Sequence, residues 1–239
     1  MRKFLSAAAA IITAVCCLTS CSESNNDTSS SETETSGRSR QTRVSSSKID
    51  EDILGTWRSD FQGYRFQDDR NVSLVMDFSN SVHFTSDGKL IVNDEEIAGD
   101  MFSYDGKTLN AQIIYEGYDE PADILSLERI DNQTSTSSFD GNYSMGECSY
   151  KKFIASSLGM TPEQIDVEVN IEGESFDVTV VDYCLYETND GKLELFSENM
   201  EYVDENANSV IYDYSINGDT LTLTYETGET EILKKSEDK

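Results

Sequence analysis

Alternation of apolar and polar side chains with a period of two is the feature that most constrains the fold. In residues 166–172, three β-branched side chains alternate with acidic and amide side chains. The same alternation runs through residues 72–78 and 220–225. This periodicity is typical of antiparallel strands that bury one face and expose the other.

Tight turns separate these alternating segments. Dipeptides in which Asp or Asn precedes Gly supply the positive φ angles that two-residue hairpin loops require. Many short strands joined in this way predict an antiparallel meander that closes as a barrel or a sandwich. The four dipeptides are Asp87-Gly88, Asp105-Gly106, Asp190-Gly191 and Asn217-Gly218.

The folded part of the chain divides into two similar halves. A polar segment at 131–138 is typical of a domain boundary and predicts one domain over 49–132 and another over 139–235. The first half begins with Gly55-Thr56-Trp57 and the second with Gly141-Asn142-Tyr143. The same order of turns follows in each half, which predicts a duplicated unit.

One segment departs from the strand pattern. Residues 149–158 place four apolar side chains at helical spacing, and Gly159 is suited to end a helix. Thr161-Pro162 then resembles the start of a second short helix. The second half is therefore expected to carry a helical insert. The four apolar side chains are Tyr150, Phe153, Ile154 and Leu158.

A Gly-x-Trp or Gly-x-Tyr on the first strand, followed by a meander of hairpins, resembles the calycin group of lipocalins and fatty-acid-binding proteins. It is also similar to the small lipocalin-like domains of lipoproteins from Gram-positive gut bacteria. The resemblance implies a mainly β chain with two tandem antiparallel β-barrels. It implies that Trp57 and Tyr143 each fill one end of a barrel, and that the insert lies over the mouth of the second. Its four apolar side chains then form either the lid of a ligand pocket or plain packing against the sheet.

The N-terminus carries the pattern of an export signal. Arg2 and Lys3 precede an apolar run over 4–18, which is too short to span a bilayer. The run ends in Leu18-Thr19-Ser20-Cys21, which resembles the lipobox of bacterial lipoproteins. The resemblance implies cleavage of residues 1–20, a lipid on the Cys21 thiol, and attachment to the outer face of the cell membrane.

Residues 21–48 are expected to form a disordered tether. Ser, Thr, Glu and Asn dominate the segment, and it has no aromatic residue. Such a composition cannot bury enough apolar area to offset the entropy of ordering. The tether therefore holds the β domains away from the membrane.

Acidic residues dominate the surface of the folded part. The formal charge of the chain is −28, and removal of Arg2 and Lys3 with the signal leaves −30. Because the tether is neutral, all of this charge lies in the β domains. A surface of this sign repels nucleic acid and anionic lipid headgroups, so neither is an expected partner.

Cysteine and histidine are scarce in the β domains. Of five cysteines only Cys148 and Cys184 follow Cys21, and in an exported chain they form either a disulfide or two separate buried thiols. His83 is the single histidine. No metal site, cofactor site or nucleophile–base arrangement is therefore predicted, and the oxygen-rich run at 204–208 is expected to be a solvated turn.

Taken together, these features predict a non-catalytic protein anchored outside the cell through Cys21. In one reading, a β domain is a binding module for a small apolar ligand or an extracellular partner. In the other, the barrels are filled by their own side chains, and the protein is a structural or accessory component of the envelope. The sequence leaves the oligomeric state open.

Overall fold

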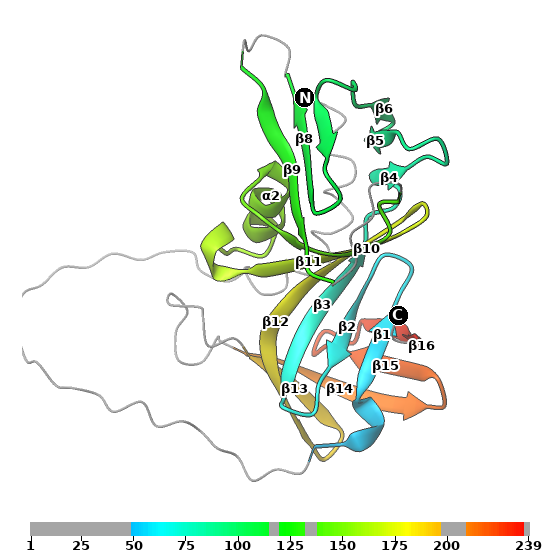
Figure 1. Ribbon diagram of the computed structural model, residues 1–239. Coiled ribbons are helices and arrows are strands. Elements are labelled where there is room, and N and C mark those ends of the chain that lie inside the picture. Colours follow the sequence, from blue (N-terminus) through cyan, green and yellow to red (C-terminus); the bar gives the residue numbers. More distant parts are fainter. Residues whose placement is uncertain (1–48, 115–119, 132–137, 197–208, 237–239) are drawn as a thin grey trace, which may run out of the picture.

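The computed structural model describes residues 49–114, 120–131, 138–196 and 209–236 (Figure 1). The predicted signal, the predicted lipidation site at Cys21 and the predicted tether lie outside these residues, as does the run at 204–208. The described chain is mainly β, as predicted, and its strands form one large antiparallel sheet and one small sheet. A single hydrophobic core runs through both halves of the chain.

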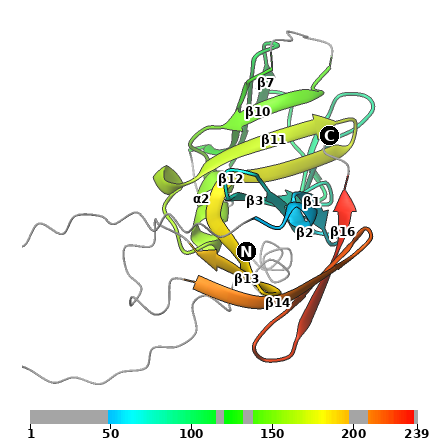
Figure 2. The ribbon, with the colours of Figure 1, turned by 90° about the horizontal axis from the view of Figure 1, so that it is seen from below.

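Eight strands of the large sheet close into an antiparallel β-barrel. The barrel closes because β12 pairs with β13 on one side and with β3 on the other. Figure 2 shows the barrel from below, with strands of the first half beside strands of the second. The barrel strands are β1 (Gly55–Arg58), β2 (Gln62–Phe66), β3 (Asn71–Asp77), β12 (Ser175–Asn189), β13 (Lys192–Phe196), β14 (Ser209–Asn217), β15 (Thr220–Thr224) and β16 (Thr230–Ser236).

The remaining strands of the large sheet continue from the first half of β12 as an open, curved layer. A separate three-stranded sheet stands beside this layer in Figure 1. The open layer contains β11 (Asp166–Glu172), β10 (Gly141–Met145), β9 (Ala122–Arg129), β8 (Thr108–Ile113) and β7 (Phe102–Tyr104). The small sheet contains β4 (Val82–Phe84), β5 (Leu90–Val92) and β6 (Glu95–Glu96).

Strand β12 joins the barrel to the open layer. Its first half pairs with β11 and its second half with β13, while β3 pairs along both. The register with β3 shifts between Val180 and Cys184, and Asp182 within this bulge has a φ of +48°. Because a bulge bends its strand and increases the local twist, it lets one long strand serve two layers.

The prediction of two tandem barrels is wrong. The barrel takes β1, β2 and β3 from the first half and β12 to β16 from the second. The predicted boundary does not separate the sheets either, since β9 and β10 pair across it with Arg129 opposite Tyr143. The physical reason is that alternation and turn chemistry specify strands and hairpins, whereas the pairing of β1 with β16 and of β3 with β12 is non-local.

The predicted local features agree well with the structure. All four Asx-Gly dipeptides lie in hairpin turns, and Asp190 and Gly191 have φ angles of +48° and +77°, as a type I′ loop requires. The predicted insert forms α2 (Ser149–Ser157), and Gly159 follows it with a φ of +69°. A 3₁₀ turn, η3 (Pro162–Gln164), comes next, and another, η2 (Glu51–Ile53), precedes β1.

The two Gly-x-aromatic motifs have matching geometry. The Trp57 indole nitrogen donates a 2.6 Å hydrogen bond to the carbonyl of Ile53, and the Tyr143 hydroxyl donates one of 2.7 Å to the carbonyl of Phe139. Each acceptor lies four residues before its aromatic donor, and both aromatic side chains are fully buried. Trp57 lies in the barrel, whereas Tyr143 lies in the open layer and fills no second barrel.

A cation on the neighbouring strand packs over each of these rings. Lys235 Nζ lies 5.0 Å from the centre of the Trp57 ring, and Arg129 Cζ lies 5.4 Å from the centre of the Tyr143 ring. Each cation belongs to the residue directly opposite its aromatic partner, on β16 and β9 respectively. These contacts lie at two of the places where strands of the first half pair with strands of the second, β1 with β16 and β9 with β10.

Candidate functional site

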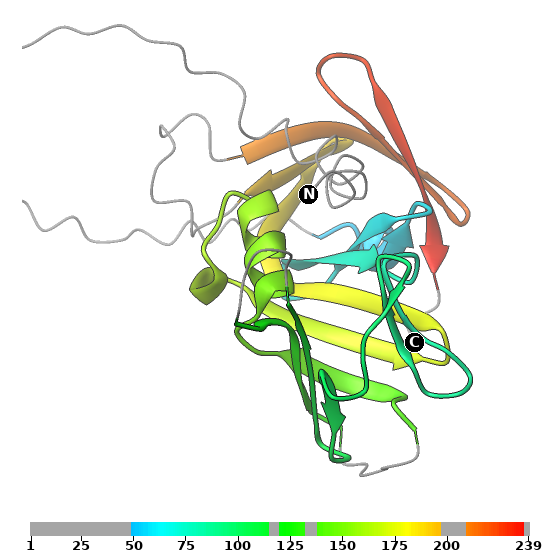
Figure 3. The ribbon, with the colours of Figure 1, turned by 90° about the horizontal axis from the view of Figure 1, so that it is seen from above.

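Helix α2 does not form the lid of a barrel. It packs against β9 and η3 in the open layer, beside the green strands of Figures 1 and 3. Ile154 and Leu158 are buried in the common core, and the Tyr150 ring meets Phe78 edge-on at 6.2 Å. Phe153 is partly buried against the same core. The structure thus favours plain packing for these four side chains, because the second closed barrel that they were expected to cover is absent from the described chain.

Cys148 and Cys184 are two separate buried thiols and form no disulfide. Cys148 is the N-cap of α2, where its sulfur accepts a hydrogen bond from the backbone amide of Lys151. Cys184 lies on β12 after the bulge. Burial raises the pKa of both thiols, that of Cys184 to about 12, so neither is poised to act as a nucleophile.

A cluster of tyrosines around one carboxylate gives the barrel interior its most distinctive chemistry. On β16, Glu231 shares the face of Leu233, which is fully buried in the core. The Tyr225 hydroxyl lies 3.3 Å from Glu231 Oε2, and the Tyr225 ring meets the Tyr212 ring at 5.0 Å in an edge-on arrangement. Tyr64 of β2, also buried, approaches the same groups. We call Tyr64, Tyr212, Tyr225 and Glu231 the tyrosine–glutamate cluster.

Burial controls the protonation of this cluster. Desolvation raises the pKa of Glu231, although hydrogen bonds from the side chains of Gln62 and Tyr225 partly oppose the rise. Desolvation, together with the nearby Glu231 carboxylate, also raises the pKa of Tyr64 and of Tyr212. The Tyr64 and Tyr212 phenols therefore hold their protons more tightly than free tyrosine, and Glu231 is the one carboxyl group of the cluster.

A second feature is a polar hollow of about 620 Å³ near η2 and the β12–β13 turn. The Tyr214 hydroxyl donates a 2.7 Å hydrogen bond to Asp50, whose backbone amide donates to Thr188 Oγ1 at 3.1 Å. These bonds tie the segment before β1 to the barrel and engage the polar groups of Asp50, Thr188 and Tyr214 with one another. The hollow is lined by Ile49, Asp50, Glu51, Asp52, Thr188, Asn189, Asp190, Gly191 and Tyr214.

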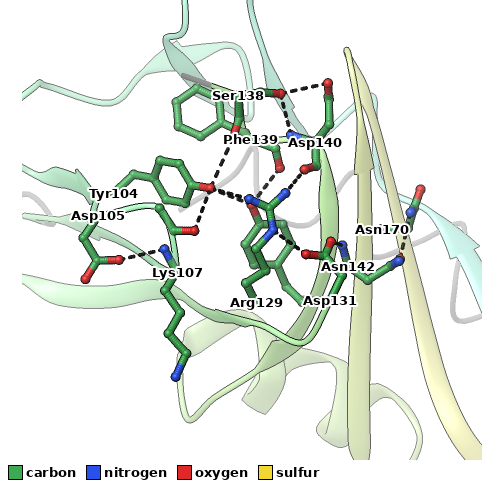
Figure 4. Close-up of polar contacts among 12 residues, drawn as sticks. Tyr104, Asp105, Lys107, Arg129, Asp131, Ser138, Phe139, Asp140, Asn142 and Asn170 are labelled. Atoms are coloured by element: carbon green, nitrogen blue, oxygen red, sulfur yellow. Dashed lines mark hydrogen bonds and ion pairs between the residues drawn. The ribbon is translucent and has the colours of Figure 1, made fainter. Parts of the chain in front are cut away.

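The third feature is the buried Arg129 shown in Figure 4. Its guanidinium donates to the Tyr104 hydroxyl at 2.9 Å and to the backbone carbonyl of Asp140. Its Nε lies 2.8 Å from Asp131 Oδ1, as an ion pair and not as an aligned hydrogen bond. Asp131 in turn accepts from the backbone amide of Asn142 at 2.9 Å. Because its guanidinium contacts Tyr104, Asp131 and the Asp140 carbonyl, Arg129 has a structural role in holding β9 to the start of β10.

Side chains that could bind a metal ion do not gather in the part of the chain that the structure describes. No group of three or more His, Cys, Asp or Glu side chains in this part of the chain could hold a metal ion. His83 lies on β4 with its Nδ1 3.1 Å from the carbonyl of Ser79. The tyrosine–glutamate cluster is therefore the best candidate site among the described residues.

Sequence reasoning missed this cluster because Tyr64 lies far in the chain from Tyr212, Tyr225 and Glu231 and reaches them only through the pairing of β1 with β16. The available signal was positional: Glu231 shares its strand face with Leu233, while Ile232 between them is 58% exposed. An acid on the apolar face of an otherwise regular strand is the pattern that marks an inward-facing carboxylate.

Comparison of the chain with protein-family models, with curated proteins and with solved structures finds no significant match. Within the described part of the chain, no helix has the length and apolar character needed to cross a bilayer.

Proposed function

We propose that this protein is a lipid-anchored, non-catalytic binding module on the outer face of the cell membrane. The observation that carries the proposal is the closed eight-stranded barrel with a carboxylate and three tyrosines on its inner side. Barrels of eight strands enclose either side chains alone or one small ligand. An inward polar group is the kind of feature that orients a ligand in an otherwise apolar site.

The anchoring part of the proposal rests on the sequence of the lipobox, Leu18-Thr19-Ser20-Cys21. Its test is the fate of the Cys21→Ala variant. With a lipid on Cys21, the wild-type chain stays with the membrane fraction, and its mature N-terminus is a modified cysteine. The variant should keep its signal peptide or be released to the medium. A wild-type N-terminus that maps elsewhere would contradict the anchor.

The binding part is tested by native mass spectrometry of the purified full chain in detergent. A binding module should retain a co-purified small molecule, or bind one from a panel that combines fatty acids with small polar aromatics. Thermal denaturation provides a second measure, since a ligand at one hundred times its Kd adds about 2.7 kcal/mol to stability. A ligand-free mass with no thermal shift across the panel would contradict the proposal.

A second candidate function is a structural or accessory protein of the envelope that works through its surface. The observation in its favour is the set of large barrel side chains that are fully buried, among them Trp57, Tyr186 and Phe66. Such side chains can fill an eight-stranded barrel by themselves. A ligand-free mass combined with normal folding would favour this candidate over a binding module.

We also infer that the chain arose from two lipocalin-like units that have exchanged strands. The matched geometry of Trp57 with Lys235 and of Tyr143 with Arg129 supports this origin. In the exchange, the opening strands β1 to β3 close a barrel with the later strands of the second half. The opening strands of the second half, β10 and β11, instead lie beside β9 of the first.

A further inference from the structure

Glu231 is a carboxylate without a cationic partner among the described residues. Its polar neighbours are the neutral side chains of Gln62 and Tyr225. The described ion pairs of the barrel lie elsewhere and include the 2.6 Å pair of Arg58 with Asp177. Glu231 is half-buried, and its carboxylate form, partly removed from water, is stabilised by a positively charged neighbour, so this position favours a cationic occupant.

The cations nearest in sequence are committed to other contacts. Lys234 lies on the opposite face of β16 and donates to Thr220 Oγ1 at 2.6 Å. Lys235 packs over the Trp57 ring at 5.0 Å. Neither is among the groups that shift the pKa of Glu231. Strand β16, which carries Glu231, therefore supplies no cation that pairs with the Glu231 carboxylate.

The tyrosines fit the same kind of occupant. A ring face attracts a cation through its quadrupole, and several rings around one acid form the kind of site that binds ammonium groups. The Tyr212 and Tyr225 rings meet edge-on at 70°, so their faces point in different directions. The phenol hydroxyls add hydrogen-bond acceptors for an N–H donor.

We propose that the tyrosine–glutamate cluster binds the ammonium group of a small organic amine, with Glu231 as its counter-ion. The apolar part of the amine lies against the barrel side chains. This assignment rests on the proposed binding function and specifies its ligand class. A bare divalent cation is a poorer fit, because calcium takes six to eight oxygen ligands and the cluster has one carboxylate. Anions are excluded by the carboxylate and by the chain's formal charge of −28.

The experiment is isothermal titration of the full chain in detergent with three probes that share one ring. Benzylamine carries the ammonium group, benzyl alcohol is its neutral counterpart, and benzoate is its anionic counterpart. We expect benzylamine to bind and benzoate not to bind. Benzyl alcohol should bind at least about tenfold more weakly than benzylamine, which corresponds to one charge-assisted contact.

Two isosteric variants locate the binding. Glu231→Gln removes the charge inside the barrel, and Glu229→Gln removes one from the exposed turn two residues earlier. We expect Glu231→Gln to weaken benzylamine binding at least about tenfold and Glu229→Gln to leave it within about twofold. Circular dichroism confirms that each variant is folded.

Failure of this assignment is distinguishable from failure of the binding function. Binding of benzyl alcohol or a fatty acid as tight as that of benzylamine would overturn the amine assignment and leave a binding module. Benzylamine binding that is unchanged in Glu231→Gln would overturn the site. No binding of any probe or fatty acid by the folded chain would overturn both proposals.

Discussion

Replacement of Arg129 by Met should destabilise the whole described fold, including the barrel that Arg129 does not touch. The substitution keeps an unbranched apolar chain and removes the guanidinium. It leaves Asp131 without its ion-pair partner and the Tyr104 hydroxyl and Asp140 carbonyl without their donor. It also removes the cation from the Tyr143 ring.

The magnitude follows from burial. The Arg129 side chain is 2% exposed and that of Asp131 is 20% exposed, so the pair is largely shielded from water. Removing one member of a buried pair costs about 3–5 kcal/mol, because the other member stays buried without compensation. With a urea m-value of about 2 kcal/mol/M, the midpoint of unfolding should fall by about 1.5–2.5 M.

The assay is urea denaturation of residues 49–239 followed by two probes. Fluorescence of Trp57, the single tryptophan, reports on the barrel, and far-ultraviolet circular dichroism reports on all strands. Because one core spans both halves, both probes should give the same lowered midpoint. The matched control is Lys107→Met, which breaks the exposed pair with Glu128 and should cost no more than about 1 kcal/mol.

Two results would refute this reasoning. A loss no larger than that of the Lys107 control would show that Arg129 does not anchor the fold. A lowered midpoint by circular dichroism with an unchanged Trp57 transition would show that the barrel unfolds independently of the open layer.

Three further outcomes follow from single sites. Gly141→Ala should lower the urea midpoint by more than Gly173→Ala, because a Cβ at 141 collides with the guanidinium of Arg129 on the neighbouring strand. A Cβ at 173 has open space, so Gly173→Ala carries only the cost of its positive φ, roughly 1–2 kcal/mol. Equal losses would contradict the close approach of Arg129 to Gly141. Because its pKa is raised in the folded state, Glu231 favours the fold below the unfolded pKa of about 4.3, and this contribution is lost as pH rises through the folded pKa. The stability of Glu231→Gln minus that of the wild type should therefore be larger at pH 8 than at pH 4. An equal difference at the two pH values would contradict burial of the carboxylate. In folded protein of residues 49–239 at pH 8, Cys148 and Cys184 should resist iodoacetamide, because both thiols are buried and their pKa values are raised. In urea without reductant, both should react. An absence of reaction in urea would reveal a disulfide.

Local structure was predictable because its causes are local. Asp190-Gly191 adopts the two positive φ angles that its turn needs, and the apolar spacing within 149–158 produces helix α2 (Ser149–Ser157). The alternation in 166–172 matches β11 residue for residue, with its β-branched side chains buried.

Non-local pairing was not predictable in the same way. Trp57 is buried in a barrel, as expected, but its strand could pair with any strand of matching pattern, and it pairs with the one that carries Lys235. The long strand 175–189 serves two layers because of a bulge at Asp182, which leaves no clear mark in the sequence. The tyrosine–glutamate cluster depends on these pairings and was missed with them.

The account depends most directly on the partner of the last strand. Amide–amide nuclear Overhauser effects in deuterated residues 49–239 identify the neighbours of each strand without any substitution. The structure predicts cross-strand contacts of 234–236 with 56–58, and of 177–180 with 74–77. Contacts of 234–236 with 141–145 instead would show that each half closes its own barrel and would contradict the fold described here.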